Sequence, residues 1–203
     1  MSMSETIGMV VKLFLLLTPF FILSIFVSVT AEFTHARRRM LALRTTFAVL
    51  VTTVVLYLFG EWIFRCLGIS LDAFRIGAGL VLLLNGIELV RDSGGTITSI
   101  RKCDSDASDI AVVPLAIPYT VGPGTIGTLL VMGAGVESAR ERITMVSAIT
   151  MAVLLLGCVL YFSDVVSQLL KAKGLNILSK LTGMYLVALA AQIIFTGIRN
   201  LLF

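Results

Sequence analysis

The fold is decided by the stretch Ile110-Ala-Val-Val-Pro-Leu-Ala-Ile-Pro-Tyr-Thr-Val-Gly-Pro-Gly-Thr-Ile126, an apolar segment that carries three of the four prolines in the chain. Each proline removes one backbone donor and clashes with the carbonyl group four residues earlier. Lipid offers no partner to a freed carbonyl group, so a helix broken here must lie against protein or a watery cavity. The fourth proline, Pro19, precedes Pro123 by 104 residues, and this offset predicts how the whole chain is organised.

Composition assigns the chain to the integral membrane proteins. Of its 203 residues, 58% are hydrophobic and 14% are charged, and the mean hydropathy is +1.02, whereas about 25% of the residues of a soluble domain are charged. Six windows have the roughly 20 apolar residues that a bilayer crossing needs: 7–29, 42–64, 70–90, 110–133, 143–168 and 178–202. We therefore expect an all-α protein with six transmembrane helices, forming one domain over residues 1–203 in contact with the lipid bilayer.

The net charge of +4 is explained by membrane orientation, so no nucleic-acid partner is expected. Ten of the 16 Lys and Arg residues fall in the three loops on one side of the predicted spans, and six fall on the other side. Since basic loops stay in the cytoplasm, we expect these three loops there and both termini outside. The three cysteines lie in separate segments without the spacing of a metal site.

An internal repeat becomes visible when the chain is shifted by 104 residues. The shift pairs Pro19 with Pro123 and Arg38 with Arg142, and it gives 11 identities between positions 19 and 57. We expect repeat 1 over residues 7–90, a cytoplasmic linker over 91–109 and repeat 2 over 110–203. Each repeat contains three spans, so the second would be inverted relative to the first, as in many secondary transporters. Drift among similar apolar helices is the alternative.

The two proline sites lie in corresponding spans, the first and the fourth. Interrupted helices at matching positions of inverted repeats point to a binding site near the membrane midplane. The candidate substrate-binding residues are Thr18, Pro19, Pro118, Thr120, Gly122, Pro123, Gly124 and Thr125, with Asn85 in the third span. The N-terminus of a half-helix favours negative groups and its C-terminal carbonyl groups favour cations, a combination that suits a zwitterion. The alternative is a kinked helix whose glycines serve close packing.

Several catalytic signatures are absent from the sequence. The single histidine, His35, lies in the basic first loop, and there is no phosphate-binding loop of the Walker type. Corresponding helices carry no pair of intramembrane carboxylates. We therefore expect no catalytic residues, no metal site and no cofactor, and hence no enzyme.

The segment Pro114-Leu-Ala-Ile-Pro118 followed by Gly122-Pro-Gly-Thr-Ile126 resembles the signature of the MarC family of bacterial inner-membrane proteins. Phe26-Val-Ser-Val-Thr30 and Gly68-Ile69-Ser70 also resemble that family's pattern. The resemblance implies six spans, kinship with the LysE-type exporter superfamily, the bacterial inner membrane and, in one branch, transport of small neutral amino acids. The family usually carries Asn-Pro in the first span, where this chain has Thr18-Pro19.

Repeat and resemblance together predict a secondary transporter or exporter of a small neutral solute. The alternative is a non-transporting membrane component, an assembly partner or a protein of envelope homeostasis. A homo-oligomer stays open, as do the substrate, the direction of transport and the coupling ion.

Overall fold

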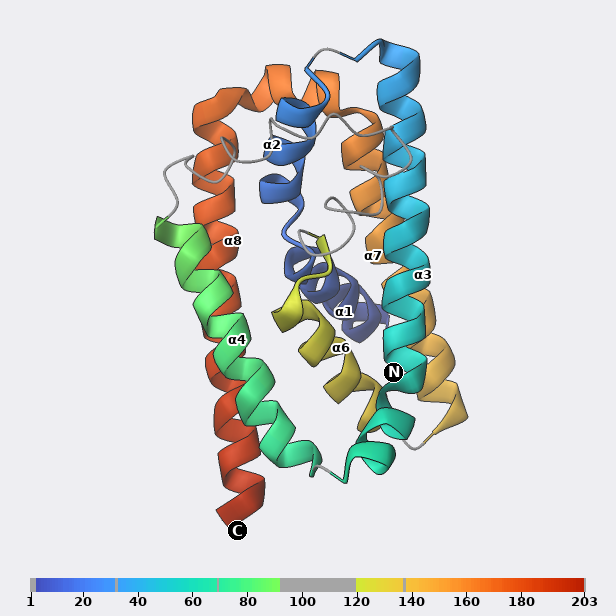
Figure 1. Ribbon diagram of the computed structural model, residues 1–203, viewed down its shortest axis with the longest axis vertical. Helices are drawn as coiled ribbons and strands as arrows, with labels where there is room; N and C mark the ends of the chain where they lie inside the picture. The colour runs from blue at the N-terminus through green and yellow to red at the C-terminus, as the bar shows by residue number, and fades with distance from the viewer. Residues whose placement is uncertain (1–2, 32, 69, 92–119, 137, 203) are drawn as a thin grey trace.

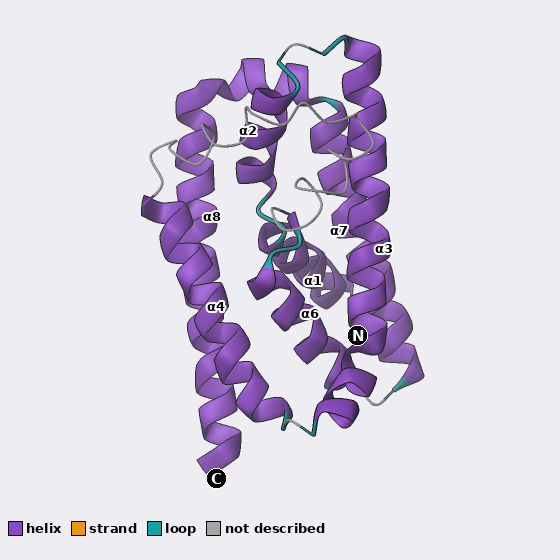
Figure 2. Cartoon of the chain, viewed as in Figure 1, coloured by secondary structure: helices purple, strands orange, loops and turns teal. Residues whose placement is uncertain are grey.

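The computed structural model describes residues 3–31, 33–68, 70–91, 120–136 and 138–202, and over these residues it is helical and contains no strand (Figures 1 and 2). The helices are α1 (Met3–Leu16), α2 (Pro19–Val29), α3 (His35–Leu67), α4 (Leu71–Arg91), α6 (Pro123–Ala134), α7 (Ala139–Tyr161) and α8 (Ser163–Leu202). The expectation of an all-α fold is thereby confirmed over the described residues.

Four helical segments are long and apolar enough to cross a membrane: His35–Gly60, Leu71–Arg91, Ala139–Tyr161 and Lys173–Leu202. The pair α1 and α2, bent by 42° where they meet, makes a fifth crossing if it counts as one broken span. The first part of the predicted window 110–133, residues 110–119, lies outside the described residues, and the remainder of that window contains α6. Residues 92–109 of the predicted linker also lie outside the described residues. Six spans and the division into repeats therefore stay predictions.

The predicted window 143–168 was wrong at its end, because α7 stops at Tyr161. Phe162 leaves helical geometry with φ −94° and ψ 24°, and α8 begins at the next residue. Lys171 then interrupts α8 with φ 52° and ψ 169°, so its first eight residues form a separate short helix. Hydropathy could not show these two turns, because the short helix is itself rich in Val and Leu.

The long helices form two pairs that enclose the short ones. Figure 1 shows α4 beside α8 along one edge and α3 beside α7 along the other, and the residue contacts agree. Helix α6 packs on α3 and α4, while α2 packs on α8 and α1 packs on α7. Helices α2 and α6 both begin near the centre of the molecule and run to opposite ends (Figure 1).

The short helices are covered by protein, as their broken backbone requires. Eight of the 12 residues of α6 are buried, and so are four apolar side chains of α2: Ile22, Leu23, Ile25 and Phe26. Most of the large exposed apolar side chains lie instead on the long helices, for example Phe47 on α3 and Phe195 on α8, which are 69% and 71% exposed, although Ile7 and Val11 on α1 are exposed too. Such side chains have the outward position that contact with lipid requires.

Glycines let α4 and α8 approach each other closely. A Cβ atom added to Gly183 would lie 2.9 Å from the carbonyl oxygen of Gly86, and a Cβ atom on Gly86 would lie 2.9 Å from that of Gly183. Farther along the same pair, a Cβ atom on Gly79 would lie 3.2 Å from the carbonyl oxygen of Ala190. Backbone atoms cannot give way as a flexible side chain can, so these positions need glycine.

We expect Gly183→Ala to lower the free energy of unfolding by about 1–3 kcal/mol, the usual cost of overpacking. The matched control is Gly77→Ala on α4, where an added Cβ atom meets nothing within 4 Å. That change should be neutral or stabilise by up to about 1 kcal/mol, because alanine favours a helix over glycine. Apparent Tm of the detergent-purified variants measures both effects. Equal Tm values would contradict the tight α4–α8 contact.

Candidate binding site at the breaks of two helices

The first break lies at Thr18, between α1 and α2. Its backbone is left-handed, with φ 49° and ψ 56°, and its side chain is 8% exposed. A β-branched residue rarely adopts this conformation, which costs about 1–2 kcal/mol relative to the right-handed region. The amide of Thr18 donates to the carbonyl group of Leu15, and this hydrogen bond closes the last turn of α1. Pro19 then begins α2 at a position that suits a residue without an N–H.

The second break precedes α6. Gly122 is extended, with φ −75° and ψ 172°, and Pro123 takes the first helical position. The side chains of Thr120 and Thr125 on either side are 2% and 5% exposed. Helices α2 and α6 therefore both begin with a proline that has a buried threonine close by. Pro118, the remaining predicted site residue of this segment, lies outside the described residues.

The structure brings the start of α6 against both α1 and α4. The hydroxyl of Thr125 donates to the carbonyl oxygen of Leu16, the last residue of α1, at 3.4 Å. On the other side, a Cβ atom added to Gly124 would lie 2.9 Å from Cα of Leu82 and 3.1 Å from Nδ2 of Asn85. The start of α6, with Gly124 and Thr125, thus lies between Asn85 of α4 and the carbonyl end of α1. Gly124 therefore packs closely against α4, as the alternative interpretation expects, and it also has the polar side chain of Asn85 as a neighbour.

A pocket of about 10 Å³ opens next to Thr125, which is room for one water molecule at most. Helices α1, α3, α6 and α7 all contribute to its lining, which is apolar except for two hydroxyl groups. The lining residues are Leu13, Leu16, Leu17, Thr53, Thr125, Leu129, Ile149, Ala152 and Val153. The hydroxyl of Thr53 donates within its own helix, to the carbonyl oxygens of Val49 at 2.7 Å and Leu50 at 3.1 Å.

The chemistry of this region is that of neutral hydrogen-bonding groups and helix ends. Helices α2 and α6 present their N-termini, where amides lack intrahelical partners and the dipole is positive. Helix α1 presents C-terminal carbonyl groups, one of which accepts from Thr125. A carboxylate fits the first environment and an ammonium group fits the second. Over the described residues, no three His, Cys, Asp or Glu side chains gather as a metal site.

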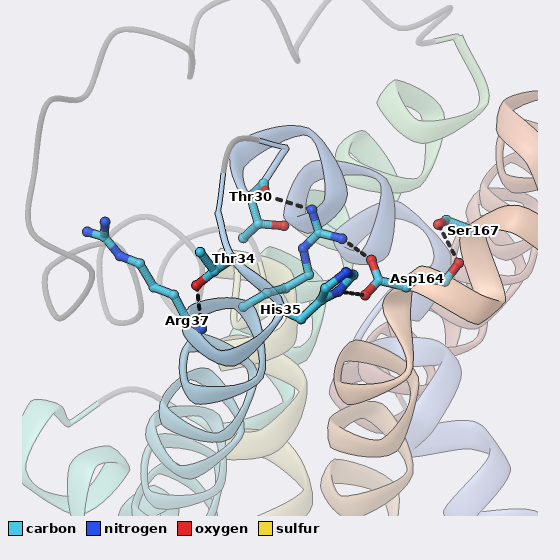
Figure 3. Close-up of polar contacts among 7 residues, drawn as sticks. Thr30, Thr34, His35, Arg37, Asp164 and Ser167 are labelled. Atoms are coloured by element: carbon cyan, nitrogen blue, oxygen red, sulfur yellow. Dashed lines mark hydrogen bonds and ion pairs between the residues drawn. The ribbon is translucent and has the colours of Figure 1, made fainter.

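A second polar cluster was missed by the sequence analysis, and it joins α2, α3 and α8 (Figure 3). The guanidinium of Arg38 donates to the carbonyl oxygen of Thr30 at 2.6 Å and forms an ion pair with Asp164. Nδ1 of His35 lies 2.9 Å from the other oxygen of Asp164. Arg38 stood out in the sequence through its match with Arg142, but a partner 126 residues away leaves no local signal.

The comparisons with known proteins identify a family of integral membrane proteins. The family model described as MarC family integral membrane protein matches residues 3–202. The chain belongs to the MarC family. No solved structure matches it.

Relatives of this MarC-family chain align over nearly its full length. It is 32% identical over 195 residues to a UPF0056 membrane protein of Methanocaldococcus jannaschii, covering 94% of each chain. It is 27% identical over 194 residues to the UPF0056 membrane protein YhcE of Escherichia coli, covering 94% of this chain and 90% of the relative. These descriptions give a membrane location and no substrate.

We expect Thr18→Asn to stabilise the protein by about 1 kcal/mol, because asparagine tolerates the left-handed region better than a β-branched residue. The matched control is Thr18→Val, which keeps the β-branch and the volume and should bring no gain. Apparent Tm in detergent measures both variants. A lower Tm for Thr18→Asn than for Thr18→Val would show that the left-handed backbone carries no strain.

We expect Asp164→Asn to lower the free energy of unfolding by about 1–2 kcal/mol. A fully buried pair costs about 3–5 kcal/mol to break, but the Asp164 side chain is 35% exposed and solvent screens part of the interaction. Glu88→Gln on α4 is the control, because it neutralises an exposed carboxylate on a neighbouring helix. If both changes shift the apparent Tm equally, the cluster contributes nothing specific.

Proposed function

We propose that this MarC-family protein is a secondary transporter or exporter of small neutral solutes, such as small amino acids, in the bacterial inner membrane. The observation that carries the proposal is the meeting of two half-helix breaks inside the protein, with helix N-termini, carbonyl groups and threonine hydroxyls around them. A broken helix costs stability, and its persistence at matching positions of two halves is the usual design of a transport site.

We further propose that the chain consists of two inverted repeats. Helix α2 begins at Pro19 and α6 at Pro123, and α3 begins at His35 and α7 at Ala139, so both pairs differ by 104 residues. Helices α2 and α6 run in opposite directions (Figure 1). Hydrogen bonds recur at this offset: Ile22 to Thr18 and Ile126 to Gly122, Arg38 to Thr34 and Arg142 to Ser138, Thr46 to Ala42 and Thr150 to Val146.

The α4–α8 contact supports the same symmetry. Gly79 lies against Ala190 in one part of the contact, and Gly183 lies against Gly86 in the other. Adding 104 to Gly79 gives Gly183, and subtracting 104 from Ala190 gives Gly86. Each contact is therefore the other one with the two halves exchanged, which is what a two-fold axis between inverted repeats produces.

Alternating access would rock one half against the other around the central site. Polar contacts join the halves at both ends of the molecule: Arg38 with Asp164 at one end, and Asn200 with Asp72, at 3.1 Å, at the other. Opening toward one side breaks one of these contacts and leaves the other in place. By the distribution of Lys and Arg, we assign the end with Arg38 to the cytoplasm and both termini to the outside.

Substitution at the second break tests the transport site. In proteoliposomes, with and without a proton gradient, we expect uptake of glycine or alanine by the wild type and its loss in Gly122→Leu and Gly124→Leu, because leucine fills the space beside the half-helix. The control is Gly77→Leu, which adds the same side chain where an added Cβ atom meets nothing within 4 Å.

Monodisperse elution and an unchanged helical circular dichroism spectrum would show that the variants still fold. Wild-type rates in both site variants would remove the site assignment. If the wild type moves neither amino acid under either condition, the result favours the alternative of a non-transporting membrane component.

A further inference from the structure

The short helix Ser163–Leu170 lies across one end of the bundle instead of along it (Figure 1). Two turns impose this course: Phe162 ends α7, and the left-handed Lys171 redirects the chain into the span that begins at Lys173. The span itself then needs no residue before Lys173 for crossing the bilayer. The short helix therefore lies at one end of that span and outside it.

The short helix has a polar side and an apolar side, and only one edge of the apolar side is buried against the protein. Successive residues advance by about 100° around a helix, so its four apolar side chains share one side and its polar side chains share the other. Val166 and Leu170 pack against the core, while Val165 and Leu169 are 63% and 79% exposed. Phe162, just before the helix, is 54% exposed. One apolar edge thus fastens the helix to the protein, and the other faces outward.

Four exposed basic side chains lie at the same end of the molecule as this outward edge. Lys171 and Lys173 follow the short helix and are exposed. Arg37 and Arg39, also exposed, lie at the start of α3, where their guanidinium groups stack on Phe33 at 4.4 Å and on Tyr161 at 5.2 Å.

The start of α3 and the start of α8 are held together. Asp164, the carboxylate that bridges them, is bound to His35 and Arg38. Its charge is therefore engaged within the cluster, while Arg37 points away from it (Figure 3). The result is a positively charged rim beside an exposed apolar edge.

We propose that this surface, formed by Phe162, Val165 and Leu169 with Arg39, Lys171 and Lys173, binds anionic phospholipids. The apolar edge enters the boundary between headgroups and acyl chains, as interfacial helices do. The basic rim contacts lipid phosphates, to which arginine presents a planar fork of donors and lysine a point charge. The inference is independent of the transport proposal, because it concerns one end of the molecule and not the central site.

Fluorescence quenching in vesicles tests the proposal. The wild type contains a single tryptophan, Trp62, so Leu169→Trp in a Trp62→Phe background places one probe on the apolar edge. Vesicles contain phosphatidylcholine and phosphatidylglycerol in fixed proportion, with bromine on the acyl chains of one lipid or of the other. We expect brominated phosphatidylglycerol to quench the probe at least about twofold more strongly per mole than brominated phosphatidylcholine.

Two comparisons identify the basic rim as the cause. The double change Lys171→Gln and Lys173→Gln should reduce the preference toward one, whereas Arg140→Gln with Arg199→Gln, which removes two exposed charges at the opposite end, should leave it intact. High salt should also reduce the preference, since it screens exposed charges. Trp62 in the wild type, 62% exposed on the last part of α3, reports the selectivity of the opposite end.

Other outcomes overturn the proposal. Equal quenching by the two brominated lipids would show lipid contact without charge recognition. No quenching by either would mean that another molecule, such as a second copy of this chain, covers the edge. A preference that survives the lysine changes, or that falls equally in the arginine control, would exclude the basic rim. Phe162→Trp gives a second probe position on the same edge should Leu169→Trp fail to fold.

Discussion

The backbone of a helix that breaks inside a membrane must find its hydrogen-bonding partners within the protein, and the rest of this structure depends on that constraint. Lipid supplies neither donors nor acceptors. Helices α2 and α6, which start at Pro19 and Pro123, are accordingly buried between the pairs α4–α8 and α3–α7. The four long spans take the outer positions because the N–H and C=O groups of an unbroken helix bond to each other, so that such a helix can face lipid.

Close helix packing follows from the same constraint. Enclosing two short helices leaves little room, and glycine supplies it where backbones approach, as at Gly124 against α4 and at Gly86 against Gly183. The first break carries its own cost in the left-handed Thr18. Local strain of this kind persists only where surrounding contacts hold it, and here buried apolar side chains of α1 and α2 provide them. A transport site at the break would use the backbone N–H and C=O groups that the break leaves without partners inside the helix.

Charged residues act at the ends of the molecule, away from the half-helix breaks. Arg38 binds the carbonyl end of α2 and Asp164 at the start of α8, and so connects three helices at one end. The short helix that contains Asp164 carries an exposed apolar edge, and exposed basic side chains lie at the same end of the molecule. The charged contacts thus join helices at this end of the molecule, away from the interior. Recognition of a neutral solute would be left to uncharged groups in the interior.

The sequence by itself determined the membrane class, most of the spans, the MarC family and the helix starts at Pro19 and Pro123, because hydropathy and proline act locally. It also brought Gly124, Thr125 and Asn85 onto one list of candidates, although it could not place them side by side. Only the tertiary structure showed that Thr125 reaches the last carbonyl group of α1, that Arg38 pairs with Asp164, and that residues 163–170 leave the span. These features depend on contacts between residues more than 100 positions apart or on single backbone dihedrals, and neither leaves a periodic pattern in the chain.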